Sequence, residues 1–369
     1  MTYDPGAFAV EWFEGRGFRQ AYVRHGTGVP LLLVHGYPET KRIWWRVIGP
    51  LAAAGFEVIV PDLRGYGDSD VGPDGLHDTV ASSHDLLALL ARLGHERVVL
   101  AGGDFGGAIV QDMAARAPER VDRLVLFNCP LPTLPSMAGL AQPAPDAHDY
   151  FVRQGTDGDA LLDELRTPAV RRRYIATFYT SRFWAHPGAF EPAAVDFHTE
   201  PFADGAKLRA SWGAYEAAFD RSARSGKALI AENPNMRALL LFGPSDHVIY
   251  PEWDRMAALV LPAGRLGDLL GMRTVFLIGL AVFAVGSVLA AVAEGDALID
   301  GWVTARPGPV VARPAPPRSA PVPLGRLVVA QPGGRRPGPG GRLLAGRVDQ
   351  LGPLAGLRIA PRGQRPARR

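Results

Sequence analysis

Short apolar stretches alternate with amphipathic ones along the first third of the chain. Residues 18–24 alternate between apolar and polar positions, as a strand does, whereas 30–34 and 56–60 are continuous apolar runs. Continuous runs are expected of strands buried on both faces of a parallel sheet. Helical patterns over 41–54 and 79–93 separate the strands, and each ends at a glycine. This order predicts an α/β fold, with a doubly wound and mostly parallel sheet.

The alternation continues, is interrupted once, and then resumes. Apolar runs at 97–101 and 123–127 predict two more strands, and 237–242 predicts another. Residues 130–230 lie between them, are rich in helical and aromatic signals, and are interpreted as a helical cap inserted into the sheet domain. The predicted domains are a core in two parts, residues 1–129 and 231–262, with the cap at 130–230.

The pattern changes near residue 262. The uncharged run at 274–293 has the roughly 20 residues that span a bilayer, although a hydrophobic helix packed on the sheet is an alternative. Residues 294–369 are rich in Pro, Gly and Arg without periodicity, which predicts a disordered tail. The core is therefore expected to end before its last strand, which would leave the edge of the 237–242 strand open.

Composition narrows the possible partners. The net charge is only +3, and its positive excess lies beyond residue 262, so the core shows no basic footprint for nucleic acid. Cys129 is the only cysteine and the N-terminus lacks a secretory signal pattern, which favours a cytoplasmic setting. The sequence contains no metal-ligand cluster, dinucleotide fingerprint or phosphate loop, so no cofactor or metal is expected.

The candidate chemistry centres on Asp104. Gly102-Gly103-Asp104-Phe105-Gly106 follows a predicted strand and precedes a helical pattern, in the form of a nucleophile elbow with aspartate as the nucleophile. An ionised carboxylate can attack an sp³ carbon and form an alkyl-enzyme ester. The alternative is that Asp104 is a surface turn residue with no catalytic role.

Four motifs in this order resemble the α/β-hydrolase superfamily, within its epoxide hydrolase and dehalogenase branch. They are His35-Gly36-Tyr37-Pro38, the loop Asp62-Leu63-Arg64-Gly65-Tyr66-Gly67-Asp68-Ser69, the Asp104 elbow and Gly243-Pro244-Ser245-Asp246. The resemblance covers residues 1–262 and implies a hydrolase with a helical cap, acting on a small apolar organic substrate.

The resemblance also implies roles for individual residues. Asp104 would be the nucleophile and Asp246 the acid, with the backbone N–H groups of Tyr37 and Phe105 forming an oxyanion hole. The structural positions of the motifs are His35, Gly36, Pro38, Gly102 and Gly106.

In epoxide hydrolases, cap tyrosines protonate the epoxide oxygen. Tyr215 and Tyr150 match these by position, and Tyr179 is a fallback for Tyr150. Dehalogenation is the alternative, although Phe105 lacks the indole N–H that haloalkane dehalogenases place after the nucleophile. Ala108 likewise lacks the arginine that fluoroacetate dehalogenases place there.

The chain departs from the family pattern after Asp246. No histidine follows His247, so the family's catalytic histidine is missing, and the ester on Asp104 is expected to stall. Gly264, Asp268, Gly271 and Arg273 resemble a loop of major facilitator transporters that precedes a transmembrane helix. An inactive chimeric or frameshifted product, with membrane contact through 274–293, is therefore a third interpretation.

Overall fold

The structure is a computed structural model, and the elements that surround the predicted elbow are among the parts it describes. The described residues are 3–132, 148–181, 188–230, 236–243, 246, 248, 253, 256 and 257, with the backbone of 326–330. They belong to one compact unit, Met1–Gly334. The segment 274–293 and most of the predicted tail lie outside the described residues, so the transporter-like helix stays a prediction. Among the described helices, none is long and apolar enough to cross a bilayer.

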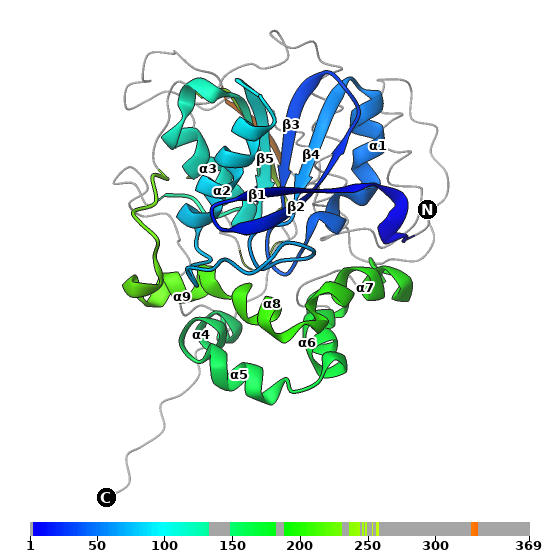
Figure 1. Cartoon of the computed structure of the whole chain (residues 1–369), viewed down its shortest axis with the longest axis vertical. Coiled ribbons are helices and arrows are strands. Elements are labelled where there is room, and N and C mark those ends of the chain that lie inside the picture. Colours follow the sequence, from blue (N-terminus) through cyan, green and yellow to red (C-terminus); the bar gives the residue numbers. More distant parts are fainter. Residues whose placement is uncertain are drawn as a thin grey trace, which may run out of the picture. The chain divides into compact units, whose positions relative to one another are not determined.

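A single mixed sheet forms the core (Figure 1). Its order is β1-β2-β4-β3-β5-β6-β7-β8, in which β3 to β7 run parallel and β1, β2 and β8 each pair antiparallel to a neighbour. The strands are β1 Val10–Gly15, β2 Phe18–His25, β3 Val29–Val34, β4 Phe56–Pro61, β5 Val98–Gly103, β6 Val121–Phe127, β7 Ala238–Phe242 and β8 Arg326–Ala330. The predicted doubly wound, mostly parallel sheet is confirmed.

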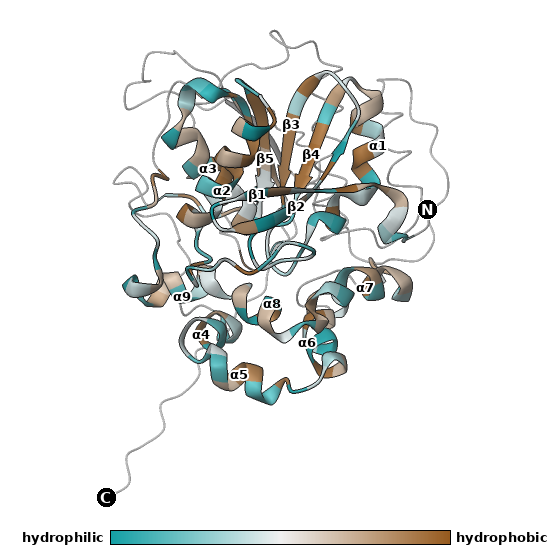
Figure 2. Ribbon diagram, viewed as in Figure 1, coloured by the Kyte–Doolittle hydropathy of each residue, from teal (hydrophilic) through white to brown (hydrophobic). Residues whose placement is uncertain are grey.

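Helices cover both faces of this sheet. Those of the core are α1 Trp45–Ala53, α2 Thr79–Arg92 and α3 Asp104–Arg116, with short 3-10 turns η1 Pro5–Ala7, η2 Lys41–Trp44 and η3 Pro118–Arg120. Alternate residues of the strands point to opposite faces. Leu32 and Leu100 pack with α2 and α3, whereas Leu31 and Val99 pack with α1. Both faces are therefore apolar, as the brown central strands of Figure 2 show.

The cap consists of helices gathered beside one edge of the core (Figure 1). They are α4 Asp149–Thr156, α5 Gly158–Glu164, α6 Pro168–Thr180, α7 Pro192–Thr199, α8 Gly205–Ala210 and α9 Gly213–Phe219, with η5 Glu200–Ala203 and η6 Arg221–Ala223. Hydrogen bonds fasten the cap to the loop after β3. Tyr179 Oη donates to the carbonyl of Pro38 at 2.6 Å, and Gln154 Nε2 donates to Tyr37 Oη at 2.6 Å.

Two strands differ from the expectations. The sequence did not predict β1, which pairs with β2 in a hairpin closed at Gly15 and Phe18. Residues 326–330 form β8 along the edge of β7, so the predictions of a disordered tail at these residues and of an open β7 edge are wrong. The strand contains adjacent β-branched residues, Val328 and Val329, which favour extended backbone, and pairing satisfies the edge of β7.

Candidate active site

Asp104 occupies the sharp turn between β5 and α3, as the elbow pattern predicts. Its φ is +46°, in the left-handed region that non-glycine residues rarely adopt. The turn is too tight for side chains on its flanking glycines, since a Cβ on Gly102 would lie 2.6 Å from the carbonyl carbon of Gly106. A Cβ on Gly36 would lie 2.5 Å from Asp104 Oδ1. Strained backbone and close approach are typical of functional turns.

Two backbone N–H groups face the Asp104 carboxylate. The N–H of Tyr37 donates to Oδ1 at 2.7 Å, and the N–H of Phe105 also hydrogen-bonds to this carboxylate. Burial raises the pKa of Asp104 to about 6, against the lowering effect of these two hydrogen bonds. The carboxylate is therefore mostly ionised at pH 7, as a nucleophile must be.

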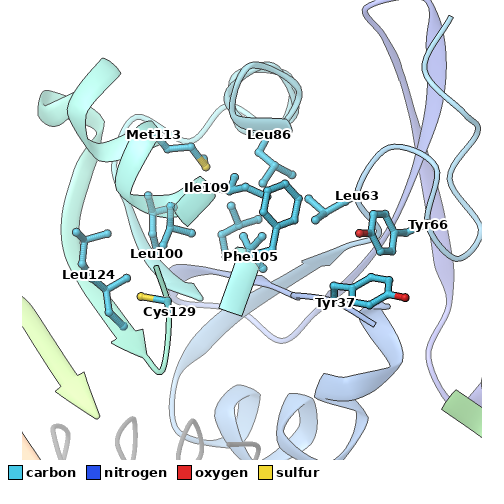
Figure 3. Packing of buried hydrophobic residues seen from close by; sticks show 14 of the residues in the cluster. Tyr37, Leu63, Tyr66, Leu86, Leu100, Phe105, Ile109, Met113, Leu124 and Cys129 are labelled. Carbon is cyan, nitrogen blue, oxygen red and sulfur yellow. The ribbon is translucent and has the colours of Figure 1, made fainter. Parts of the chain in front are cut away.

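The side chain of Phe105 points away from its own N–H group into the core. Figure 3 shows its ring beside Leu63, Leu86 and Ile109. The residue is buried and belongs to the same apolar cluster as these neighbours. The backbone N–H of Phe105 thus binds the Asp104 carboxylate, while its ring stabilises the start of α3.

Asp246 lies beyond the end of β7 and is close enough to influence the nucleophile. Its negative charge contributes to the raised pKa of Asp104. Asn128 Nδ2 donates to Asp246 Oδ2 at 2.8 Å, and the N–H of Val248 donates to Oδ1 at 2.7 Å. The structure therefore brings the predicted acid and the predicted nucleophile to the same edge of the sheet.

Asn128, which sequence analysis missed, connects these two residues. Its carbonyl accepts the N–H of Asp104 at 3.0 Å, and its amide bonds both the N–H and the carbonyl of Gly243, at 2.8 and 3.1 Å. The residue has φ +34° at the end of β6, which lies between β5 and β7. A polar residue directly after a predicted parallel strand was the available signal, because such strand ends meet at one edge.

The two predicted cap tyrosines lie together above the elbow. Tyr150 lies in the first turn of α4 and Tyr215 lies in α9; their side chains are hydrogen-bonded to each other and their ring centroids are 5.7 Å apart. Burial raises the pKa of both phenols, and the negative charge of Asp104 raises both further. Both hydroxyls therefore stay protonated at neutral pH and lie within the electrostatic reach of the nucleophile.

Tyr179, the fallback, has a different position. Its hydroxyl donates to the carbonyl of Pro38, and its ring stacks on His198 at 5.4 Å. These contacts give it a role in fastening the cap, and Tyr150 is the better candidate for an acid near Asp104.

His35 supports the loop that carries Tyr37, as its structural assignment expects. The ring is fully buried, with Nδ1 bonded to the carbonyl of Gly36 at 2.9 Å and Nε2 accepting the N–H of Leu63 at 3.1 Å. Burial lowers its pKa to about 4, so the ring is neutral at pH 7. Both nitrogens are engaged within the loop framework, which leaves neither available as a base.

A second carboxyl group near Asp104 was also missed. Glu39 Oε2 accepts the N–H of Gly36 at 2.8 Å, and burial raises the pKa of Glu39 to about 8, with Asp104 adding to the rise. His247 lies outside the described residues. Within the described ranges, no group of three or more His, Cys, Asp or Glu side chains could hold a metal ion.

Comparison with known proteins agrees with this geometry. Residues 29–195 match the family described as alpha/beta hydrolase fold. The chain has the α/β-hydrolase fold. It is 34% identical over 165 residues to a soluble epoxide hydrolase of Corynebacterium sp. (strain C12), covering 44% of this chain and 56% of that protein. It is also 34% identical over 154 residues to the bifunctional epoxide hydrolase 2 of Sus scrofa, covering 40% of this chain and 28% of that protein.

Solved structures extend the likeness to the fold. The epoxide hydrolase CorEH without ligand superposes with a TM-score of 0.56 at 25% identity, over 64% of this chain and 83% of that one. The chain spans about half or less of the length of the two curated relatives. The predicted α/β-hydrolase fold and the predicted likeness to epoxide hydrolases are thus confirmed, and the reaction of this chain is a proposal.

Proposed function

We propose that this α/β-hydrolase opens epoxides of small apolar organic molecules by attack of Asp104 on an oxirane carbon. The observation that carries the proposal is the joint placement of three groups. An ionisable carboxylate is held by the N–H of Tyr37, and two protonated hydroxyls, of Tyr150 and Tyr215, lie within its field. The carboxylate supplies the nucleophile, and the hydroxyls supply the acid that an oxirane oxygen requires on leaving.

The attack forms one bond and breaks one. A carboxylate oxygen of Asp104 bonds to the oxirane carbon as the carbon–oxygen bond of the ring breaks, and the oxygen takes a proton from Tyr150 or Tyr215. The product is a hydroxyalkyl ester of Asp104. Hydrogen bonds from Tyr37 and Phe105 then polarise the ester carbonyl and stabilise the oxyanion formed when water attacks it.

The experiment is intact-protein mass spectrometry after incubation with phenyloxirane. The wild-type protein should gain the mass of one phenyloxirane, and digestion should place any trapped adduct on Asp104. Asp104→Asn should lose the adduct, with a decrease of at least about 10⁴-fold in its rate of formation. Asp196→Asn, which changes a surface ion pair with Arg172, is the control and should behave as wild type. Absence of any adduct or diol with the wild type would overturn the proposal.

Dehalogenation is the second candidate, because the same nucleophile displaces halide. The indole N–H of Trp212 donates to Tyr37 Oη at 3.3 Å, and Trp212 is buried. The ring of Phe105 packs in the core. These contacts disfavour a halide site among the described residues. Release of halide from haloalkanes, without diol formation from phenyloxirane, would reverse this preference.

A further inference from the structure

Gln154 of the cap is a buried polar side chain that the proposed reaction does not use. It lies in α4 with none of its surface exposed, and its amide nitrogen donates to the hydroxyls of Tyr37 and Tyr174 at 2.6 and 2.8 Å. The amide oxygen, Oε1, is also buried and has no hydrogen-bond partner among the residues that the structure describes. Because buried polar atoms are nearly always hydrogen-bonded, this unpaired acceptor requires an explanation.

Gln154 lies beside the groups that the proposed reaction uses. It follows Tyr150 by four residues in α4, so the two side chains project from the same face of the helix, with Cβ atoms about 5–6 Å apart. Its partner Tyr37 packs its ring against Tyr215 at 5.3 Å and donates its backbone N–H to Asp104 at 2.7 Å. The amide is therefore one hydrogen bond away from a residue that contacts both a proton donor and the nucleophile.

Two other buried glutamines have an unpaired Oε1 but a different setting. Gln20 and Gln111 donate their amide nitrogens to backbone carbonyls of the core, at distances between 2.9 and 3.0 Å. Such contacts hold neighbouring backbone segments together, which is a structural role. The amide of Gln154 instead bonds two phenols, and one of these, Tyr37, belongs to the candidate active site.

The walls around this amide are aromatic. Trp212 is fully buried and donates its indole N–H to Tyr37 Oη, the same oxygen to which Gln154 donates. The ring of Phe178 packs against those of Tyr37 and Tyr150 at 5.6 and 5.2 Å. Apolar walls with a few placed polar atoms are typical of sites that orient small molecules. An acceptor enclosed in this way favours a ligand that brings a donor, because the low local dielectric strengthens their hydrogen bond.

We propose that Gln154 Oε1 accepts a hydrogen bond from a hydroxyl group of the substrate, so that the chain prefers epoxides carrying a hydroxyl on an otherwise apolar frame. This inference rests on the proposed function. While Tyr150 or Tyr215 donates to the oxirane oxygen, the substrate hydroxyl donates to Oε1 one helical turn further along α4. That spacing suits a hydroxyl within a few bonds of the ring. Gln154 takes no part in bond making; it orients the ring toward Asp104, which favours attack.

A structural role for Gln154 makes a different prediction. If the amide only holds the two phenols in place, its loss should change the rates of all epoxides alike, whereas loss of a hydroxyl partner affects hydroxylated epoxides selectively. Gln154→Met keeps the length and the unbranched shape of the side chain but removes the amide. Gln111→Met is the matched control, because Gln111 is also a buried glutamine with an unpaired Oε1 but lies in α3 and bonds backbone carbonyls.

The experiment compares 3-phenylglycidol with 2-ethyl-3-phenyloxirane, which has a methyl group in place of the hydroxyl. The rate of adduct plus diol formation with each epoxide is divided by its rate with acetate in water, which removes the difference in intrinsic reactivity. The wild type and Gln111→Met should favour the alcohol by about 10- to 100-fold, and Gln154→Met by less than about threefold. The methyl ether of 3-phenylglycidol cannot donate a hydrogen bond, so it should react with the wild type no faster than the ethyl compound.

The outcomes separate this inference from the proposed function. Failure of all three proteins to form an adduct or diol with any of these epoxides would overturn the proposed function. If the epoxides react, an equal preference in the wild type and Gln154→Met would overturn the role of Gln154 alone. A wild-type preference below about threefold, or a methyl ether that reacts as fast as the alcohol, would do the same. These last two comparisons need no variant, so they decide the matter even if Gln154→Met does not fold.

Discussion

The two halves of the candidate site are held by different forces. In the core half, Asp104, Asn128 and Asp246 lie at or beyond the ends of neighbouring parallel strands, and backbone and amide hydrogen bonds join them. In the cap half, Tyr150 and Tyr215 come from two helices and are positioned mainly by contacts between aromatic rings. The sheet fixes the nucleophile through its register, whereas the acid depends on how helices pack.

Tyr37 connects these halves. Its backbone N–H binds Asp104, while its hydroxyl accepts hydrogen bonds from Gln154 and Trp212 of the cap. Its ring packs against Tyr215 at 5.3 Å. Tyr37 therefore contacts both the cap and the oxyanion position, and variants in either half should be distinguishable by which step they slow.

Among changes that leave the nucleophile in place, the largest effect is expected from removing the cap hydroxyls. The double variant Tyr150→Phe, Tyr215→Phe keeps the ring packing but removes both proton donors, so the rate of adduct formation should fall by about 10²- to 10⁴-fold. Mass spectrometry of samples quenched at set times after mixing with phenyloxirane measures this rate. Tyr174→Phe is the control, because its hydroxyl bonds Gln154 and it also lies in the cap. Adduct formation at the wild-type rate in the double variant would show that the two cap hydroxyls take no part in the reaction.

The core half was more accessible to sequence analysis than the cap half. Continuous apolar runs predicted β3 and β4 to within one residue at each end, because strands buried on both faces leave no polar positions. β1 was missed since Glu11, Trp12 and Glu14 are exposed and break up any apolar pattern, and its strand conformation depends on pairing with β2. The cap could be located by composition, whereas its helix order could not.

Residues of the candidate site also differ in how far the sequence alone could predict them. The glycine spacing identified Asp104, because a sharp turn imposes local constraints that the sequence displays. Asn128 and Glu39 carry no such local signal: the first acts because β6 lies between β5 and β7, and the second because the turn at Gly36 lies against the elbow. Both depend on contacts between distant segments, which only the folded chain reveals.

The second prediction concerns the pH dependence of alkylation. Burial raises the pKa of Asp104 to about 6, and only the ionised carboxylate attacks. The rate of adduct formation should therefore be constant above about pH 7 and decrease about tenfold per pH unit below 6. Uncatalysed loss of phenyloxirane, measured with Asp104→Asn at each pH, provides the correction. A rate that does not change between pH 5 and pH 8 would contradict the buried, carboxylate-flanked environment described for Asp104.

The third prediction tests the link within the core half. Asn128→Asp places a negative charge against Asp246 and next to the backbone contact with Asp104, so the pKa of Asp104 should rise. Adduct formation should be about tenfold slower at pH 6 and nearly unchanged at pH 9. Asn128→Gly tolerates the φ of +34° and removes the amide without adding charge, so its pH profile should keep the wild-type midpoint. Equal midpoints in all three proteins would show that Asn128 does not couple Asp246 to Asp104.

The smallest effect is on stability. It concerns the ionisation of the buried Glu39 and is measured without substrate. Its pKa of about 8 in the folded protein exceeds the usual 4.5, so the folded state retains a proton that the unfolded chain releases between these values. Wild-type stability should therefore fall as pH rises from 4.5 to 8, a loss that Glu39→Gln avoids. At pH 8.5 the variant should be more stable by on the order of 1 kcal/mol, or about 2–4 °C in unfolding midpoint, with no gain at pH 4.5.

Glu57→Gln provides the comparison for this last effect. Glu57 is buried to the same extent but is paired with Arg24, so its replacement removes a favourable charge contact and should not raise the midpoint at pH 8.5. Parallel pH profiles of the midpoint for wild type and Glu39→Gln would mean that Glu39 ionises normally in the folded protein. In that case its carboxylate would be fully charged at neutral pH, and the nucleophile would face a permanent negative neighbour on the β3 side, in addition to Asp246 on the β7 side.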